Sequence, residues 1–189
     1  MFSRLVQYWV YGGFLAGILL LLLLPAFARD WSAALLGVFV QLPVYMLHQY
    51  EEHDNDRFRL FVNRMMGKDV LSHQAVFIIN VPGVWGVNAA SFLFAFYVSI
   101  GYGLIGIYLT LVNAVTHVVV ALVSRSYNPG LGTAVLLFLP AGVFGLRAMQ
   151  GMDEVRWQHH LLGLLIAVGI HVAIVVYTMV NRHNTRPAT

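Results

Sequence analysis

The stretch that decides the fold class spans residues 70–124 and reads VLSHQAVFIINVPGVWGVNAASFLFAFYVSIGYGLIGIYLTLVNAVTHVVVALVS. These 55 residues contain no Asp, Glu, Lys or Arg. A bilayer core of ~30 Å needs about 20 apolar residues of helix, so the stretch is long enough for two spans. Gly101 and Gly103 mark the natural turn between them. We expect spans at about 73–100 and 103–124, the first kinked or broken at Pro82-Gly83.

The composition of the whole chain agrees with this assignment. Hydrophobic residues make up 59% of the 189 residues and charged residues 10%, whereas an average soluble domain is roughly 25% charged. A mean hydropathy of +0.74 also excludes a disordered chain. The absence of cysteine excludes disulfides, thiolate metal sites, iron–sulfur clusters and cysteine nucleophiles. The net charge of +3 is too small and too spread out to indicate nucleic acid binding.

Apolar runs on both sides of this stretch complete the predicted architecture. It is all-α, a single integral membrane domain over residues 1–189, built as a polytopic bundle of about six transmembrane helices. The first run also resembles a signal peptide, because Ala26-Phe27-Ala28 looks like a cleavage site. We expect an uncleaved helix there, with cleavage as the alternative. The four further spans are expected at about 9–28, 31–50, 130–148 and 157–181.

The basic residues predict how the bundle is oriented. Six spans place both termini and the loops at 51–72 and 125–130 on one side of the membrane. Within the first of these loops, residues 55–68 form an amphipathic segment, which is typical of an interfacial helix. Three Lys or Arg residues lie on the opposite side, so the positive-inside rule predicts cytoplasmic termini. The side that holds both termini carries eight: Arg4, Arg57, Arg59, Arg64, Lys68, Arg125, Arg182 and Arg186.

The strongest candidate site is at the cytoplasmic end of the second span, in His48-Gln-Tyr-Glu51-Glu52. On a helix, His48 is three residues from Glu51 and four from Glu52, so all three side chains share a face. Imidazole and carboxylate groups at this spacing can bind one divalent ion, and two carboxylates can bridge two. The alternative is a solvated acidic helix end.

Two more spans carry polar residues at a similar depth. Asn113 and His117 are one helical turn apart, and His117 lies seven residues before Ser124, ~10 Å from the cytoplasmic boundary. His171, near the middle of the last span, is either a further metal ligand or a donor that bonds another helix. Tyr127 lies in the loop before the fifth span, ahead of the turn at Pro129-Gly130. Asn113 and His117, together with Asn80 of the third span, can meet His48, Glu51 and Glu52 in the inner half of the bundle.

The motifs resemble those of a family of uncharacterised bacterial integral membrane proteins named for its HXXEE motif. His48 to Glu52 matches that motif, Asn113 to His117 matches an N-x-x-x-H motif, and Tyr127 to Thr133 matches a Y-x-P-G-x-x-T motif. The three occur in the family's order over residues 48–133. The resemblance implies that these residues act together in the inner membrane of a bacterium, but it implies no reaction.

Several functions fit these residues. The first is a metal-dependent enzyme that acts on a lipid-like substrate near the cytoplasmic leaflet, with hydrolysis slightly favoured over oxidation. Zinc, iron or manganese suits nitrogen and oxygen ligands. The alternatives are a proton- or cation-coupled carrier or channel, a haem-binding subunit with His117 and His171 as axial ligands, and a structural subunit. The oligomeric state stays open. The metal ligands would be His48, Glu51, Glu52, His117 and His171, and the catalytic groups Glu51, Glu52, Asn113 and Tyr127.

Overall fold

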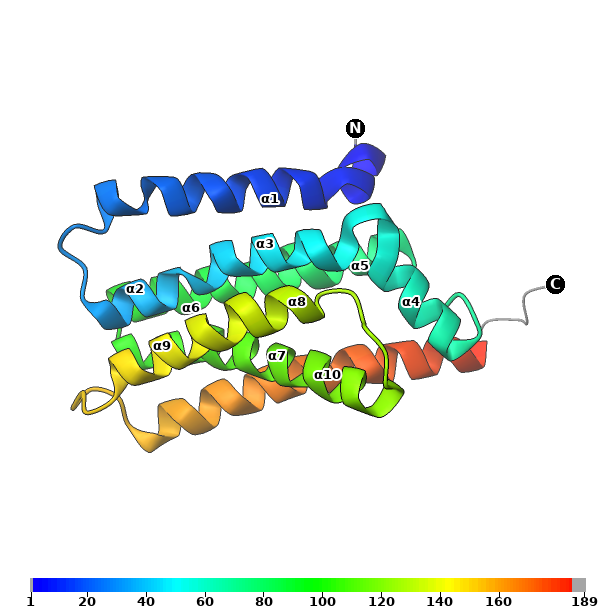
Figure 1. Ribbon diagram of the computed structural model, residues 1–189. Coiled ribbons are helices and arrows are strands. Elements are labelled where there is room, and N and C mark those ends of the chain that lie inside the picture. Colours follow the sequence, from blue (N-terminus) through cyan, green and yellow to red (C-terminus); the bar gives the residue numbers. More distant parts are fainter. Residues whose placement is uncertain (1, 185–189) are drawn as a thin grey trace.

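A computed structural model describes residues 2–184, so Arg186 of the charge count lies outside the described residues. Over this range the chain forms six long helices and no strands (Figure 1). Five of them are long and apolar enough to cross a membrane. The elements are α1 (Phe2–Phe27), α2 (Ala33–Phe39), α3 (Gln41–His53), η1 (Asp54–Asp56), α4 (Arg57–Met66), α5 (His73–Ile78), η2 (Ile79–Trp85), α6 (Gly86–Tyr97), η3 (Ile100–Gly103), α7 (Leu104–Ser124), α8 (Leu131–Thr133), η4 (Ala134–Phe138), α9 (Leu139–Met149) and α10 (Trp157–Asn184).

The remaining long helix is formed by α2 and α3, which follow one another along one line (Figure 1). Backbone bonds continue across the junction, from Val40 N to Leu36 O and from Val44 N to Val40 O, both 3.1 Å. Pro43 offers no N–H at this point, which explains the local interruption. This helix is less apolar than the other five because it carries many polar side chains. These side chains, Gln41 and His48 among them, are buried inside the bundle.

Two of the spans contain π-helical turns beside a proline. One of these, η2, includes Pro82, and the other, η4, ends two residues before Pro140. Proline removes a backbone donor and its ring clashes with the preceding turn, so the hydrogen-bond register shifts locally while the helix continues. The kink expected at Pro82-Gly83 therefore takes the form of a π-turn within one continuous span.

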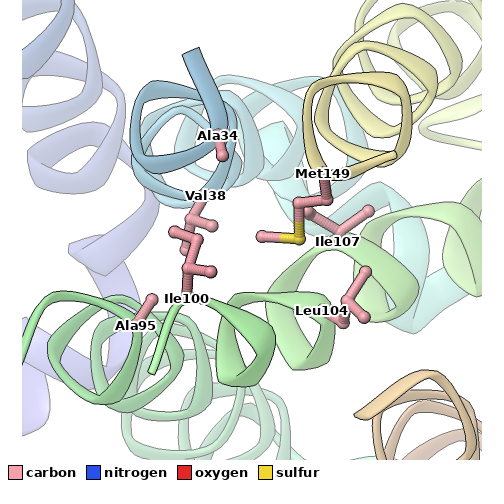
Figure 2. Close-up of a cluster of buried hydrophobic side chains, with 7 residues drawn as sticks. All are labelled: Ala34, Val38, Ala95, Ile100, Leu104, Ile107 and Met149. Carbon is pink, nitrogen blue, oxygen red and sulfur yellow. The ribbon is translucent and has the colours of Figure 1, made fainter. Parts of the chain in front are cut away.

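A compact apolar cluster holds together the end of the bundle that lies opposite the chain termini. It joins α2, α6, η3, α7 and α9, and Figure 2 shows the Met149 side chain reaching toward Val38 and Ile100. Two glycines let α2 and α9 approach closely, since a Cβ on Gly37 would lie 2.9 Å from the Cα of Gly145. The cluster consists of Ala34, Val38, Ala95, Ile100, Leu104, Ile107 and Met149.

Large hydrophobic side chains make up much of the outer surface of the bundle. Within the most apolar 18 residues of α1, and likewise of α10, only 17% of the residues are buried. The exposed side chains of these helices are mainly large hydrophobics. A soluble protein rarely exposes contiguous apolar patches larger than a few hundred Å². Lipid chains cover such a surface without cost, so the molecule is a polytopic membrane protein.

One loop determines where the functional residues meet. After α7 ends at Ser124, residues 125–130 fold back along the bundle before α8 begins (Figure 1). Left-handed backbone at Arg125 (φ 50°) and Gly130 (φ 94°) makes the two bends. The start of α8 therefore lies beside the interior of α7 rather than at its end, and its backbone N–H groups point toward α3.

Candidate metal centre

Three buried side chains converge between α3 and α7. His48 and Glu52 are one helical turn apart on α3, and His117 faces them from α7. Their exposed fractions are 0%, 6% and 6%. One ligand atom from each lies within 4.8 Å of the other two. The carboxylate of Glu52 is in the middle, with His48 Nε2 3.6 Å from Oε2 and His117 Nε2 3.5 Å from Oε1.

The orientation of His48 is set by Thr133 at the end of α8. The Thr133 hydroxyl donates its one proton to Glu51, so its oxygen accepts from His48 Nδ1 at 2.8 Å. That bond fixes the proton of the neutral imidazole on Nδ1 and leaves a lone pair on Nε2. Among the described residues, His48 Nε2 has no hydrogen-bond partner, although it is fully buried.

Asn128 orients His117 in the same way. Its Nδ2 donates to the His117 carbonyl oxygen at 2.9 Å, which turns Oδ1 toward the ring, 2.6 Å from Nδ1. A carbonyl oxygen only accepts, so Nδ1 of His117 carries a proton, and in the neutral imidazole Nε2 carries the lone pair. Both histidines therefore present a nitrogen lone pair to the carboxylate of Glu52.

Two lone pairs and a carboxylate that face one another in a buried site form a suitable environment for a cation. A proton fits this geometry poorly, because charge-assisted N–H···O bonds are ~2.7–2.9 Å long and the two N–O distances here are 3.5 and 3.6 Å. Ligand atoms held ~2.0–2.1 Å from one tetrahedral ion are about 3.3–3.4 Å apart. The two N–O distances are close to that value, and one ligand atom from each side chain lies within 4.8 Å of the other two, so a divalent metal can fit the group.

Glu51 points away from this group, toward the start of α8. Its carboxylate accepts from the backbone N–H groups of Gly132 (3.1 Å) and Thr133 (2.6 Å), and also from the Thr133 and Tyr127 hydroxyls. An anion at a helix N-terminus satisfies donors that have no partner within the helix. Glu51 thus holds the folded-back loop against α3. It also bonds directly to Thr133, the residue that orients His48.

The other expected site residues lie around the group rather than in it. Partial burial and the hydrogen bond to Glu51 raise the pKa of Tyr127 to about 12, so its phenol keeps its proton at neutral pH. Asn113 lies one turn deeper than His117, and its Oδ1 is buried with no partner in the described part of the chain. His171 Nδ1 donates to Ala167 O at 2.8 Å, within its own helix.

Several residues of the site were not singled out by sequence reasoning. His53 Nε2 is 3.1 Å from Glu52 Oε2, although the direction is not that of a hydrogen bond. Asn128 and Thr133 orient the two histidines, and Gly130 packs against both rings. Asn128, Gly130 and Thr133 all lie within the Y-x-P-G-x-x-T motif, whose Pro-Gly pair resembles an ordinary turn. Only the occurrence of the three motifs together in one chain indicated that this loop belongs to the site.

An apolar cavity of about 210 Å³ opens beside this histidine–glutamate cluster. Glu52, His53 and His117 form part of its wall, and Asn113 and His171 also line it. Most of the remaining wall is made of aliphatic, aromatic and methionine side chains from α4, η2, α7 and α10. A ligand in this cavity would therefore present its polar group to Glu52 and its apolar part to the rest.

The fold and the site together define a polytopic helical membrane protein with a buried histidine–glutamate cluster. The model of a family described as "Protein of unknown function with HXXEE motif" matches residues 39–145, which include all three motifs. The chain belongs to this family. No curated protein and no solved structure matches it.

Proposed function

We propose that the protein is a membrane-embedded, metal-dependent enzyme that acts on a lipid-like substrate, with hydrolysis favoured over oxidation. The observation that carries this proposal is the convergence of His48 Nε2, His117 Nε2 and the Glu52 carboxylate in a buried site. Each imidazole is held by a bond to its other nitrogen, as metal-binding histidines generally are.

The number of ligands supports a catalytic role over a purely structural one. Structural zinc sites are closed by four protein ligands, whereas catalytic sites keep three and an open position. Here three side chains form the group. Nitrogen and oxygen ligands without sulfur suit zinc, iron or manganese.

The choice of hydrolysis rests on the position of Glu51. Oxidation by a pair of metal ions needs carboxylates that bridge them, and the Glu51 carboxylate is already occupied by donors from the start of α8. One bound ion supplies a Lewis acid and lowers the pKa of a coordinated water to about 7. The amide of Asn113, one turn below His117 on the cavity wall, would hold the polar group of the substrate.

The charge distribution supports placing this site near the cytoplasmic leaflet, in the inner membrane of a bacterium. Both ends of the described chain lie at the end of the bundle that carries α4 (Figure 1), and the basic residues gather there. We expect a C-terminal reporter that is active only in the cytoplasm to be active. Activity of a reporter that works only outside the cytoplasm would contradict this orientation.

The activity is tested on protein reconstituted in liposomes of phosphatidylethanolamine and phosphatidylglycerol. Protein stripped with chelator and reloaded with Zn²⁺, Fe²⁺ or Mn²⁺ should release fatty acid or headgroup with one of the metals. Glu52→Gln should abolish the release, since it removes the charged ligand. His183→Ala, at an exposed position near the end of α10, should leave it unchanged. Equal release by stripped, reloaded and Glu52→Gln protein would contradict a metal-dependent reaction.

A further inference from the structure

The cavity beside the metal centre is elongated along the helices. Its lining on α7 extends from Val120 to Leu109, about 16 Å by helical rise, and on α10 from Thr178 to Ile170, about 12 Å. Its volume of about 210 Å³ is below the ~300–1,000 Å³ of drug-sized ligand sites. A cavity of this volume whose lining extends this far along two helices suits one extended chain.

The two ends of the cavity differ in chemistry. Its deep end is formed by Leu109, Tyr45 and Val84, which are buried and belong to one hydrophobic cluster. Toward the other end are the carboxylate of Glu52 and the imidazole of His117. A hydrocarbon chain therefore fits the deep end, with the polar group that it carries beside the metal ligands.

The rim of the cavity faces the surroundings of the bundle rather than its interior. Met65 of α4, Thr116 of α7 and Val175 of α10 all line the cavity and are exposed. The exposed surfaces of α7 and α10 are apolar, so lipid covers them in the membrane. The rim is therefore open to the side where these exposed residues of α4, α7 and α10 lie, within the leaflet on the side of the chain termini.

We infer that the cavity takes one hydrocarbon chain of a membrane lipid, which enters sideways from this leaflet and brings its linkage to the headgroup beside Glu52 and His117. The reaction of the bound lipid rests on the proposed function, whereas the binding of its hydrocarbon chain does not. A lipid chain runs roughly parallel to the helices, so it can enter without turning. α4 forms the cover, and its methionines, Met65 and Met66, adapt readily to a chain.

Two neighbouring valines on α10 provide a matched pair of variants. Val175 lines the cavity and is 48% exposed, whereas Val176 is 51% exposed and does not line it. A tryptophan at position 175 would close the rim, and a tryptophan at position 176 would extend into lipid. Thr116 and Val119 on α7 form a second pair, because both are exposed and only Thr116 lines the cavity.

The experiment uses full-length protein in liposomes that contain a phospholipid with a diazirine on one acyl chain. After illumination, mass spectrometry locates the labelled residues, and the metal content of each sample is measured separately. We expect labelling at cavity residues such as Ile174 and Asn113 in the wild type. Val175→Trp and Thr116→Trp should lose it, whereas Val176→Trp and Val119→Trp should keep it. All five proteins should retain the same metal content.

The outcomes separate the two proposals. Labelling confined to exposed faces, or reduced equally by both members of a pair, would overturn the lipid-chain site even if metal is present. Labelling that only Val175→Trp and Thr116→Trp abolish, in protein that binds no metal, would support the chain site and overturn the metal-dependent function.

Discussion

At the scale of single residues, two adjacent glutamates have different partners. Glu52 faces the imidazoles of His48 and His117, whereas Glu51 accepts hydrogen bonds from the start of α8. The motif spacing predicts that both carboxylates share the face of His48. Which of them is free to bind a metal depends on the loop that packs against α3, and the spacing carries no information about that loop.

We predict opposite results for the two amide substitutions. Glu52→Gln removes the charged ligand and should abolish metal binding, whereas Glu51→Gln should retain the metal with affinity lowered about 10- to 100-fold, because Glu51 acts through Thr133. Titration of purified protein with zinc against a competing chelator measures both. Loss of metal in Glu51→Gln together with full retention in Glu52→Gln would reverse the assignment.

Gly130 provides a second test at this scale. A Cβ there would lie 2.7 Å from His48 Cε1 and 2.8 Å from His117 Cε1, so Gly130→Ala must displace the rings. Gly151 is the matched control, because its φ is also positive (79°) but its Cβ would meet nothing within 4 Å. Both alanine variants should lose about 1–2 kcal/mol of unfolding free energy through backbone strain, as thermal melting would show. Metal binding should weaken in Gly130→Ala alone, and equal metal affinity in the two variants would argue against the ring contact.

At the scale of elements, the folded-back loop and the first turn of α8 complete the site. Thr133 connects Glu51 to His48, so its hydroxyl orients the imidazole while its backbone N–H binds the carboxylate. Through its side chain and its backbone, Thr133 thus connects the start of α8 to both His48 and Glu51.

The role of this hydroxyl can be tested with two variants of similar size. Thr133→Val keeps the shape and removes the hydroxyl, so His48 Nδ1 loses its acceptor, and metal affinity should fall about 10- to 100-fold. Thr133→Ser keeps the hydroxyl and should bind metal nearly as the wild type does. The measurement is the same zinc competition titration. Comparable affinities for the valine and serine variants would show that the hydroxyl does not orient His48.

The elements also show what the sequence can and cannot predict. Absence of charge over residues 70–124 predicts two spans, and Gly101 and Gly103 predict the turn between them, where η3 lies. The path of residues 125–130 could not be predicted, because Pro129-Gly130 specifies a turn but not the direction in which the chain returns. His117 was predicted as a site residue from its depth in the membrane. Asn128 was missed because only the path of residues 125–130 brings it next to its partner, His117.

At the scale of the whole molecule, an apolar exterior surrounds a polar site that lies off the middle of the bundle. The helix made of α2 and α3 carries the most buried polar groups, and the apolar α1 lies between much of it and the surroundings (Figure 1). Polar side chains are costly in lipid unless they are paired or face the interior of a bundle. The predicted all-α membrane bundle is therefore confirmed, and the arrangement explains why this helix is the least apolar one.

The central claim is that His48, Glu52 and His117 bind a divalent metal in the folded protein. A ligand that binds only the folded state stabilises it by about 2.7 kcal/mol when its free concentration is a hundred times its dissociation constant. Chelator should therefore lower the melting temperature of the wild type, and restoring the correct metal should raise it again. The response should be lost in His117→Ala and kept in His171→Ala, since His171 lines the cavity but lies outside the group.

The most direct measurement is elemental analysis of detergent-purified protein, read together with these melting temperatures. The account predicts about one zinc, iron or manganese ion per chain in the wild type and in His171→Ala, and none in His117→Ala. Wild type and His117→Ala that carry no metal, and that melt alike with and without chelator, would contradict it.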